Sequence, residues 1–194
     1  MTKQRALLLI KPDAVQRGLI GKIIKRFEQT GLKIIGLKFV WATSEEIKSH
    51  YPETEAWFKK VGERTLSNYK KKGLDAGKVF GTNDAMAIGK TVKKWLIEYL
   101  QESPIFITVV EGYEAIEIVR KISGNTIPLL AAPGTVRGDF SHDAIDLANE
   151  QNRPLRNLIH ASDTIEDAED EIRVWFKDEE LFEYQRADEK FMYA

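Results

Sequence analysis

The sequence contains no cysteine, so several kinds of chemistry are excluded at the outset. Disulfide bridges, thiolate metal sites and thiol nucleophiles all require cysteine side chains. Histidine is also scarce, with 3 residues in a chain of 194, which leaves few candidates for a reactive imidazole. Because a chain without cysteine suits a reducing compartment, we expect a cytoplasmic protein.

Long hydrophobic runs and an excess of charge of one sign are lacking as well. The apolar run in the N-terminal stretch MTKQRALLLIKPD is too short for the core of a signal peptide or for a membrane span. Lys and Arg number 29 against 30 Asp and Glu, so nothing favours a membrane surface or an obligate nucleic-acid partner. An anionic ligand must therefore be met by a local cluster of basic side chains.

The hydrophobic pattern predicts an alternation of strands and helices. The run ALLLI at 6–10 is typical of a central strand buried on both faces. Segment 32–41 indicates a strand that carries Ile35, Leu37, Phe39 and Trp41 on one face. The other predicted elements are helices at 20–27, from Thr43 toward Tyr51, at 92–100, 113–123, 142–150 and 164–176, and strands at 105–110 and up to His160.

This order predicts an α+β fold. Without the added helices it reads βαββαβ, which is the ferredoxin-like sandwich of a four-stranded antiparallel sheet with helices on a face. The length and the hydrophobic content of 43% allow one good core. We therefore predict a single domain over residues 1–194, with an insertion at about 52–89, where the pattern loosens into charge-rich segments.

Several short motifs resemble known functional sites but do not meet their requirements. IGKT at 88–91 resembles the end of a phosphate-binding P-loop, but Asp84 stands where that loop needs a glycine, so we expect a helix to begin near Thr91. A P-loop ATPase that uses Lys90 is therefore disfavoured. His50 and His142 have no partner at metal-ligand spacing, and we expect both at the surface.

Three segments, in this order, resemble the nucleoside diphosphate kinase family: ALLLIKPDAVQRGLIGKII, APGTVRGDF and NLIHASDTIEDAEDEIRVWF. The resemblance implies an enzyme that transfers the terminal phosphoryl of a nucleoside triphosphate, chiefly ATP, to a nucleoside diphosphate. It implies a ping-pong mechanism through a phosphohistidine. The alternative from another class is a non-catalytic nucleotide-binding or interaction module of the same fold.

The resemblance also assigns the site residues. His160 falls on the nucleophile, Glu171 on the acid that orients its ring, and Ser162 on a hydroxyl close to the transferring phosphoryl. An imidazole suits this role because its ordinary pKa of about 6.5 leaves it largely neutral at neutral pH. The nucleotide-binding positions are Lys11, Tyr51, Arg120, Thr126 and Arg137 for the phosphates and Asn157 for a sugar hydroxyl.

The remaining expectations concern the cation, the base and the assembly. The resemblance implies Mg²⁺ carried by the nucleotide phosphates, with a water-mediated contact to Asp163 and no direct protein ligand. Val92 stands where the family has a stacking phenylalanine, so base contact is expected to be weaker or shared with Leu96 or the inserted lobe. Residues 141–152 form a second insertion, and Ile127 replaces an asparagine.

The family assembles as hexamers or tetramers, so a homo-oligomer is expected. The tail from Leu181 onward is rich in aromatic side chains, which suits a segment that packs on a neighbouring subunit. The alternative is that the tail folds back on its own subunit. The aromatic residues concerned are Phe182, Tyr184, Phe191 and Tyr193.

Overall fold

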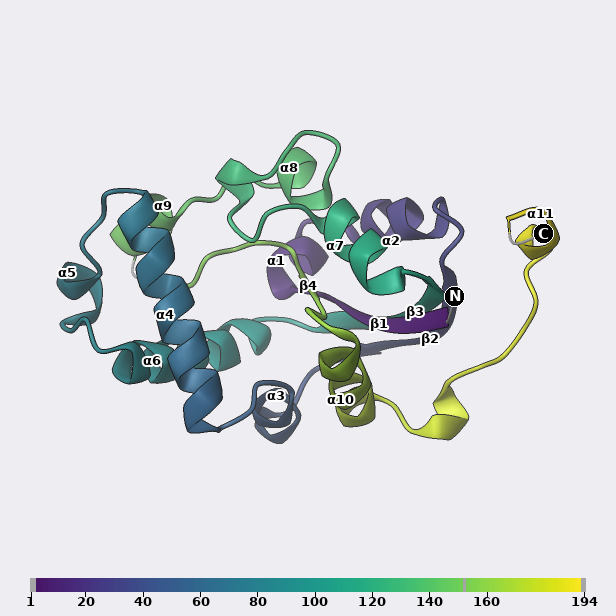
Figure 1. The fold of residues 1–194 in the computed structure, drawn as a ribbon, viewed down its shortest axis with the longest axis horizontal. Coiled ribbons are helices and arrows are strands. Elements are labelled where there is room, and N and C mark those ends of the chain that lie inside the picture. The colour runs from purple at the N-terminus through teal and green to yellow at the C-terminus, as the bar shows by residue number, and fades with distance from the viewer. Residues whose placement is uncertain (1–2, 152, 193–194) are drawn as a thin grey trace.

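A four-stranded antiparallel sheet lies at the centre of the computed structural model, which describes residues 3–151 and 153–192 (Figure 1). The strands stand in the order β2-β3-β1-β4. Their bounds are Lys3–Ile10 for β1, Lys33–Val40 for β2, Ile105–Tyr113 for β3 and Ile159–Ala161 for β4. The predicted α+β, ferredoxin-like fold is confirmed.

The central strand β1 is buried on both faces, as its continuous apolar sequence predicts. Leu8 and Ile10 pack with helices α2 (Ile20–Glu28) and α7 (Ala115–Ser123). Leu7 and Leu9 face the other side, toward α3 (Ser44–His50) and α10 (Ile165–Trp175). Helices therefore cover both faces of the sheet, rather than the single face expected from the sequence (Figure 1).

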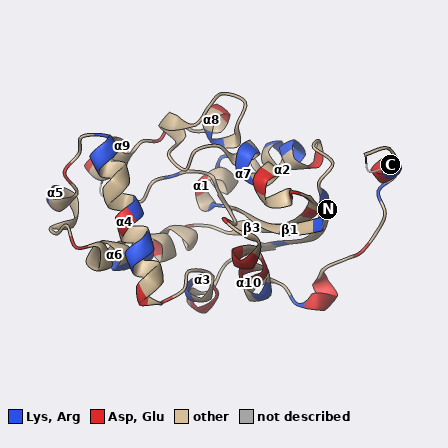
Figure 2. Ribbon diagram, in the orientation of Figure 1, with Lys and Arg blue, Asp and Glu red and all other residues tan. Residues whose placement is uncertain are grey.

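Threonine side chains cap the N-termini of helices α3 and α10. Glu46 N donates to Thr43 Oγ1 at 3.2 Å, and Thr43 N donates to Glu46 Oε2 at 2.8 Å, so the two residues form a capping box at the start of α3. Thr164 Oγ1 accepts from Asp167 N at 3.0 Å and caps α10. Acidic residues crowd the start of α10 (Figure 2), where the positive end of the helix dipole stabilises them.

A lobe of helices lies at one end of the sheet (Figure 1). It consists of α4 (Glu55–Lys71), α5 (Ala76–Phe80) and α6 (Ala85–Leu100). Helices α4 and α6 approach closely because glycines lie at the crossing: a Cβ at Gly62 would lie 1.8 Å from the oxygen of Ala85. A Cβ at Gly89 would lie 2.1 Å from the oxygen of Phe58. The predicted insertion at 52–89 is therefore largely helical.

The IGKT motif lies inside α6, so the predicted helix start near Thr91 is wrong. The helix begins at Ala85, and Asp84 Oδ1 accepts from Ala87 N at 2.7 Å as its N-cap. Asp84, the residue that disfavours a P-loop, is thus the signal that starts the helix. Gly89 allows the close approach of α6 to α4, because it has no side chain.

The remaining short helices lie in connections. They are α1 (Pro12–Gln16), η1 (Pro128–Leu130), α8 (Val136–Phe140), α9 (Ile145–Glu150), η2 (Asp178–Glu180) and α11 (Glu189–Met192). Helix α9, within the predicted helical patch at 142–150, contacts the lobe. Tyr69 donates its hydroxyl to Asn149 Oδ1 at 2.5 Å, and Lys72 lies 3.8 Å from Asp146. Both predicted insertions therefore pack against each other, in a small apolar cluster that includes Ile88 and Ile145.

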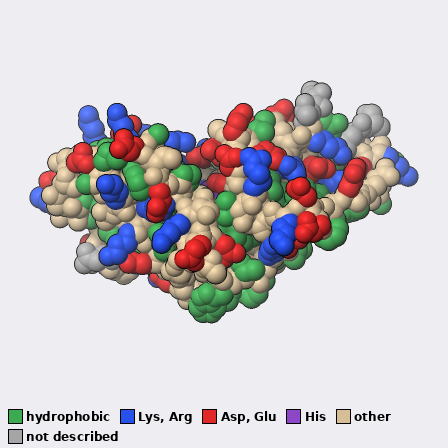
Figure 3. Space-filling view, turned by 90° about the horizontal axis from the view of Figure 1, so that it is seen from below, with side chains coloured by type: hydrophobic (Ala, Val, Ile, Leu, Met, Phe, Trp, Pro, Cys, Tyr) green, Lys and Arg blue, Asp and Glu red, His purple; other side chains and the backbone are tan. Residues whose placement is uncertain are grey.

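The edge strand β2 exposes most of the apolar residues that the sequence predicts on one face of segment 32–41. Ile35 is buried, whereas Leu37, Phe39 and Trp41 are 58%, 57% and 64% exposed. The register shifts between Ile34 and Gly36, which breaks the alternation of the strand. Figure 3 shows apolar side chains gathered along the lower margin of the molecule.

The C-terminal tail folds back on its own subunit along β2. Phe182 N donates to the carbonyl of Ile35 at 2.7 Å, and Lys33 Nζ donates to the carbonyl of Tyr184 at 2.9 Å. The rings of Phe182, Tyr184 and Phe191 nevertheless stay exposed, and Tyr193 lies outside the described residues. Among the described helices, none is long and apolar enough to cross a membrane.

The glycine at the α4–α6 crossing generates a prediction about stability. Gly62→Ala places a methyl group against the main chain of Ala85, and we expect a loss of about 1–3 kcal/mol in the free energy of unfolding, measured by urea denaturation. Gly21→Ala is the matched control, because its Cβ would meet open space on α2. It should raise the stability by about 0.5–1 kcal/mol. Equal stabilities of the two variants would contradict the close crossing.

Candidate active site

A pocket of about 450 Å³ lies between strand β4 and the helical lobe. The structure brings eight of the nine sequence-predicted site residues to its wall. These are Lys11, Tyr51, Arg120, Thr126, Arg137, Asn157, His160 and Glu171. The ninth, Ser162, is not among the lining residues. The predicted residues come from segments far apart in the sequence, and only the fold unites them.

His160 stands on β4 beside Leu9 of the central strand, and its ring is oriented by an acid. His160 Nε2 lies 2.8 Å from Glu171 Oε1. Because a carboxylate only accepts hydrogen bonds, the ring proton belongs on Nε2, and Nδ1 keeps its lone pair. Burial raises the pKa of Glu171, but the charge of His160 and the hydrogen bonds from His160 and Ser162 outweigh it, so the net pKa is below the ordinary value.

Ser162 lies behind this pair rather than toward the pocket. Its side chain is buried, with 1% of the residue exposed, and its hydroxyl donates to Glu171 Oε2 at 2.7 Å. Leu7 N donates to the same hydroxyl oxygen at 3.2 Å. The structure thus brings Ser162 to the carboxylate of Glu171, and its place beside the transferring phosphoryl stays a prediction.

A strained turn precedes His160. Leu158 has a φ of 69°, a value uncommon for residues other than glycine, and Ile159 N donates to the carbonyl of Asn157 at 2.8 Å across it. The buried guanidinium of Arg137 donates to the carbonyls on both sides, to Asn157 at 3.0 Å and to Ile159 at 2.8 Å. A third bond reaches the carbonyl of Gly124 at 2.7 Å. Arg137 therefore fixes the backbone that carries His160.

Lys11 and Asn157 form the floor of the pocket. Lys11 Nζ donates to Asn157 Oδ1 at 2.7 Å, and Asn157 Nδ2 donates to the carbonyl of Thr126 at 3.0 Å. Burial, with the nearby charge of Arg137, lowers the pKa of Lys11 to about 7. The floor thus holds an ammonium group that lacks a full counter-charge, which favours an anionic ligand.

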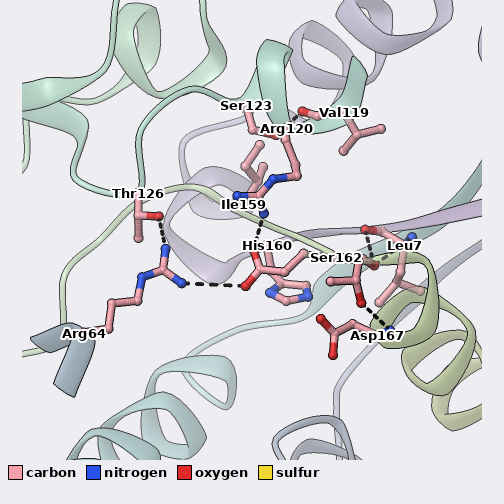
Figure 4. Close-up of polar contacts among 12 residues, drawn as sticks. Leu7, Arg64, Val119, Arg120, Ser123, Thr126, Ile159, His160, Ser162 and Asp167 are labelled. Atoms are coloured by element: carbon pink, nitrogen blue, oxygen red, sulfur yellow. Dashed lines mark hydrogen bonds and ion pairs between the residues drawn. The ribbon is translucent and has the colours of Figure 1, made fainter. Parts of the chain in front are cut away.

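Two arginines meet at the side of the pocket around Asp163. Arg120, from α7, forms a close ion pair with Asp163 Oδ1. Arg64, from α4, lies 3.7 Å from Asp163 Oδ2 and donates to Thr126 Oγ1 at 2.7 Å (Figure 4). Sequence analysis missed Arg64 because it belongs to no motif. The available signal was helical spacing, since Val61, Arg64 and Asn68 fall on one face of α4 and line the pocket.

His50 is buried against the ring of His160, so its predicted surface position is wrong, whereas His142 is exposed as predicted. The His50 and His160 rings meet edge to face with centroids 4.6 Å apart. Burial, followed by the charge of His160, lowers the pKa of His50 to about 3, so the ring stays neutral. The neighbouring Tyr51 ring also contacts His160 edge-on, and burial raises the pKa of its hydroxyl, which stays protonated.

The cluster of His50, His160 and Glu171 is a poor metal site despite its spacing. The potential ligand atoms lie within 4.8 Å of one another. However, Trp175 Nε1 donates to His50 Nδ1 at 3.3 Å, which places the His50 proton on Nε2, and a protonated nitrogen offers no lone pair to a metal. His50 therefore serves as a neutral packing partner of His160.

The outer part of the pocket is apolar. Val92 and Leu96 of α6, which the sequence places at the base position, line it. Helices α4 and α5 contribute Trp57, Val61 and Phe80. Ile127 is buried in the cluster beneath this wall.

A pocket that combines an oriented imidazole with several basic side chains is typical of proteins that bind phosphorylated ligands. Comparison with protein families makes this specific. The family model described as nucleoside diphosphate kinase matches residues 4–68 and 85–181. The chain belongs to the nucleoside diphosphate kinase family. The match is interrupted between 68 and 85, which falls within the predicted insertion at 52–89.

Similar proteins span nearly the whole chain. The nucleoside diphosphate kinase of Pyrobaculum aerophilum is 48% identical over 94% of this chain and 100% of its own. A crystal structure of an NDP kinase from that organism matches with a TM-score of 0.88, at 46% identity, over 94% of this chain and 100% of its own. A Borrelia burgdorferi enzyme, described as a transition-state mimic with vanadate and ADP, matches with a TM-score of 0.76, at 38% identity, over 96% and 95%.

The low pKa of Lys11 predicts a pH-dependent cost of burial. In the folded state the pKa is about 7, below that of an unfolded lysine, so the unfolded chain binds more protons between about pH 7 and pH 10. The cost is thus full below pH 7 and fades as the pH rises. We expect Lys11→Met to raise the free energy of unfolding at pH 6.5, with a smaller gain at pH 9.5. A gain independent of pH in urea titrations would refute this reading.

Proposed function

We propose that this nucleoside diphosphate kinase works through a phosphohistidine at His160. Nδ1 attacks the terminal phosphorus of a nucleoside triphosphate, chiefly ATP; the N–P bond forms, the bond to the bridging oxygen breaks, and the nucleoside diphosphate leaves. A second diphosphate then takes the phosphoryl by the reverse step. The observation that carries the proposal is the contact between His160 Nε2 and Glu171 Oε1, which leaves Nδ1 as the nucleophile.

The surrounding side chains are proposed to hold the phosphates in line with Nδ1. Lys11 and Arg120 supply positive charge toward the phosphate oxygens, and Thr126 and Tyr51 supply hydroxyl groups. Arg137 is proposed to act through the same positive field and, in addition, by holding the turn at Leu158.

The nucleoside is proposed to extend from the floor to the apolar outer wall. Asn157 is assigned to a sugar hydroxyl, for which it must exchange one of its hydrogen bonds to the protein. The base is assigned to the wall formed by Val92, Leu96 and the lobe residues Trp57 and Val61. Apolar contacts of this kind discriminate weakly among bases.

The nucleotide is proposed to enter as its complex with a divalent cation, namely Mg²⁺. The oxygens of the phosphates and water are the ligands that this ion prefers. Asp163 is the carboxylate assigned to the cation-bound water, and its oxygens are paired with Arg120 and Arg64. The ion neutralises developing charge when bound.

A labelling experiment tests the nucleophile. Incubation of the wild type with ATP labelled in the terminal phosphate should give an acid-labile, base-stable phosphoenzyme, and His160→Ala should give none. Lys90→Ala is the matched control, because Lys90 lies on α6 away from the pocket lining and should label normally. Normal labelling of His160→Ala would sink the assignment. A binding module would bind ATP without transferring phosphoryl to GDP.

We also propose that the enzyme is a homo-oligomer, a hexamer or a tetramer. The support is the row of exposed apolar side chains at Leu37 and Phe39 on the edge strand β2 and at Trp41 directly after it. The cytoplasmic location and the lack of an obligate nucleic-acid or membrane partner stay predictions from the sequence.

The edge strand offers a test of assembly. Light scattering of the wild type should give four or six times the mass of the chain, and Phe39→Lys together with Trp41→Lys should lower it, because two buried charges oppose association. Ile165→Lys is the control, since Ile165 is 45% exposed on α10, away from that edge. An unchanged mass in the double variant would place the interface elsewhere.

A further inference from the structure

We propose that Arg64 is a fourth basic phosphate-binding residue of this kinase, and that Asp163 holds its place until the nucleotide arrives. The inference rests on the proposed function, because it assigns one more contact to the same nucleotide. Arg64 lies in the lobe and belongs to none of the motifs that carry the family resemblance.

The geometry places the Arg64 guanidinium on the phosphate side of the pocket. Its Nη2 donates to Thr126 Oγ1, a hydroxyl assigned to the phosphates, at 2.7 Å, and its Nη1 lies 3.7 Å from Asp163 Oδ2. Arg120 binds the other oxygen of the same carboxylate. In Figure 4, Arg64 and Arg120 approach the region beside His160 from two different helices. Two guanidinium groups thus share one carboxylate at the wall of the pocket.

The charges around this point favour a stronger anion than Asp163. Burial and then the charges of Arg64 and Arg120 lower the pKa of Arg137 to about 10, which indicates a surplus of positive charge. A terminal phosphate offers more charge and more acceptor oxygens than a carboxylate, and it fits the fork of an arginine. The phosphates of the nucleotide should therefore displace Asp163 from Arg64. Asp163 is then available to the water around the divalent cation.

Arg64 is carried by a braced helix rather than by a loose loop. Gly62, two residues earlier, lies against the main chain of α6. Tyr69, further along α4, is hydrogen-bonded to Asn149 of α9. Val61 and Asn68 line the same pocket from the same face of α4. The braced helix therefore fixes the backbone that carries Arg64, while the Arg64 side chain itself is 51% exposed.

Titration calorimetry with ADP and AMP, in buffer with EDTA, tests the contact. Arg64→Ala should weaken ADP about 10-fold to 100-fold, the loss expected for a charge-assisted hydrogen bond, and AMP by less than about threefold. Arg64→Lys keeps the positive charge but lacks the two parallel donors of a guanidinium. Its ADP affinity should lie between those of the wild type and of Arg64→Ala. Lys59→Ala is the matched control, because it removes one charge from an exposed position of α4 outside the pocket lining.

If the phosphates replace Asp163 at Arg64, removing the charge of Asp163 should strengthen ADP binding, whereas Arg64→Ala weakens it. Asp163→Asn weakens the competitor, so ADP should bind about twofold to fivefold more tightly than to the wild type. The gain should be smaller in the Arg64→Ala background. Unchanged ADP affinity in both Arg64 variants, or equal losses for ADP and AMP, would overturn the proposal; weaker binding by Asp163→Asn would overturn the exchange.

Failure of the proposed function gives a different result. A wild type that forms no phosphoenzyme refutes the role of His160, whereas the ratio of ADP to AMP affinities reports on Arg64 independently. Circular dichroism melts of each variant verify folding, and if Arg64→Ala fails to fold, Arg64→Lys carries the comparison.

Discussion

The hydrogen bonds from Arg137 to main-chain carbonyls support the geometry on which the site depends. They hold Leu158 in a left-handed conformation that costs of order 1–3 kcal/mol. That turn lets Asn157 meet Lys11 while His160, three residues on, meets Glu171. A straight strand would send these side chains in directions set by strict alternation. The positions of Asn157 and His160 are thus coupled through one buried guanidinium.

The site is held ready for an anion at the expense of stability. Lys11 and Arg137 are both buried, and burial lowers the pKa of each. Side chains that are fixed before the ligand arrives need little reorganisation during transfer, which is the basis of electrostatic catalysis. Glu171 shows the opposite balance, because its partners His160 and Ser162 stabilise the carboxylate against its own burial.

The features that depend on neighbours in the sequence could be predicted from it. The strand ALLLI, the helix that begins after Thr43 and the helix predicted at 164–176 follow from patterns within a few residues. The motifs likewise indicated which distant residues share the pocket.

What the sequence could not give depends on packing between distant segments. His50 is buried because Trp175 and His160 pack against it, and Ser162 turns toward Glu171 because Leu7 N approaches its oxygen. The exposure of Leu37 follows from a break in the register of β2. Arg64 can be recognised as a pocket residue only from the fold, which brings α4 next to Thr126.

The contacts between the two predicted insertions affect how nucleotides bind to the pocket and leave it. Tyr69 and Lys72 at the end of α4 are tied to Asn149 and Asp146 of α9. A ping-pong reaction requires the first product to leave before the second substrate enters the same place. Contacts between α4 and α9 hold the rim of the pocket in place. Both nucleotides can therefore enter and leave through the same opening without a conformational change of the rim.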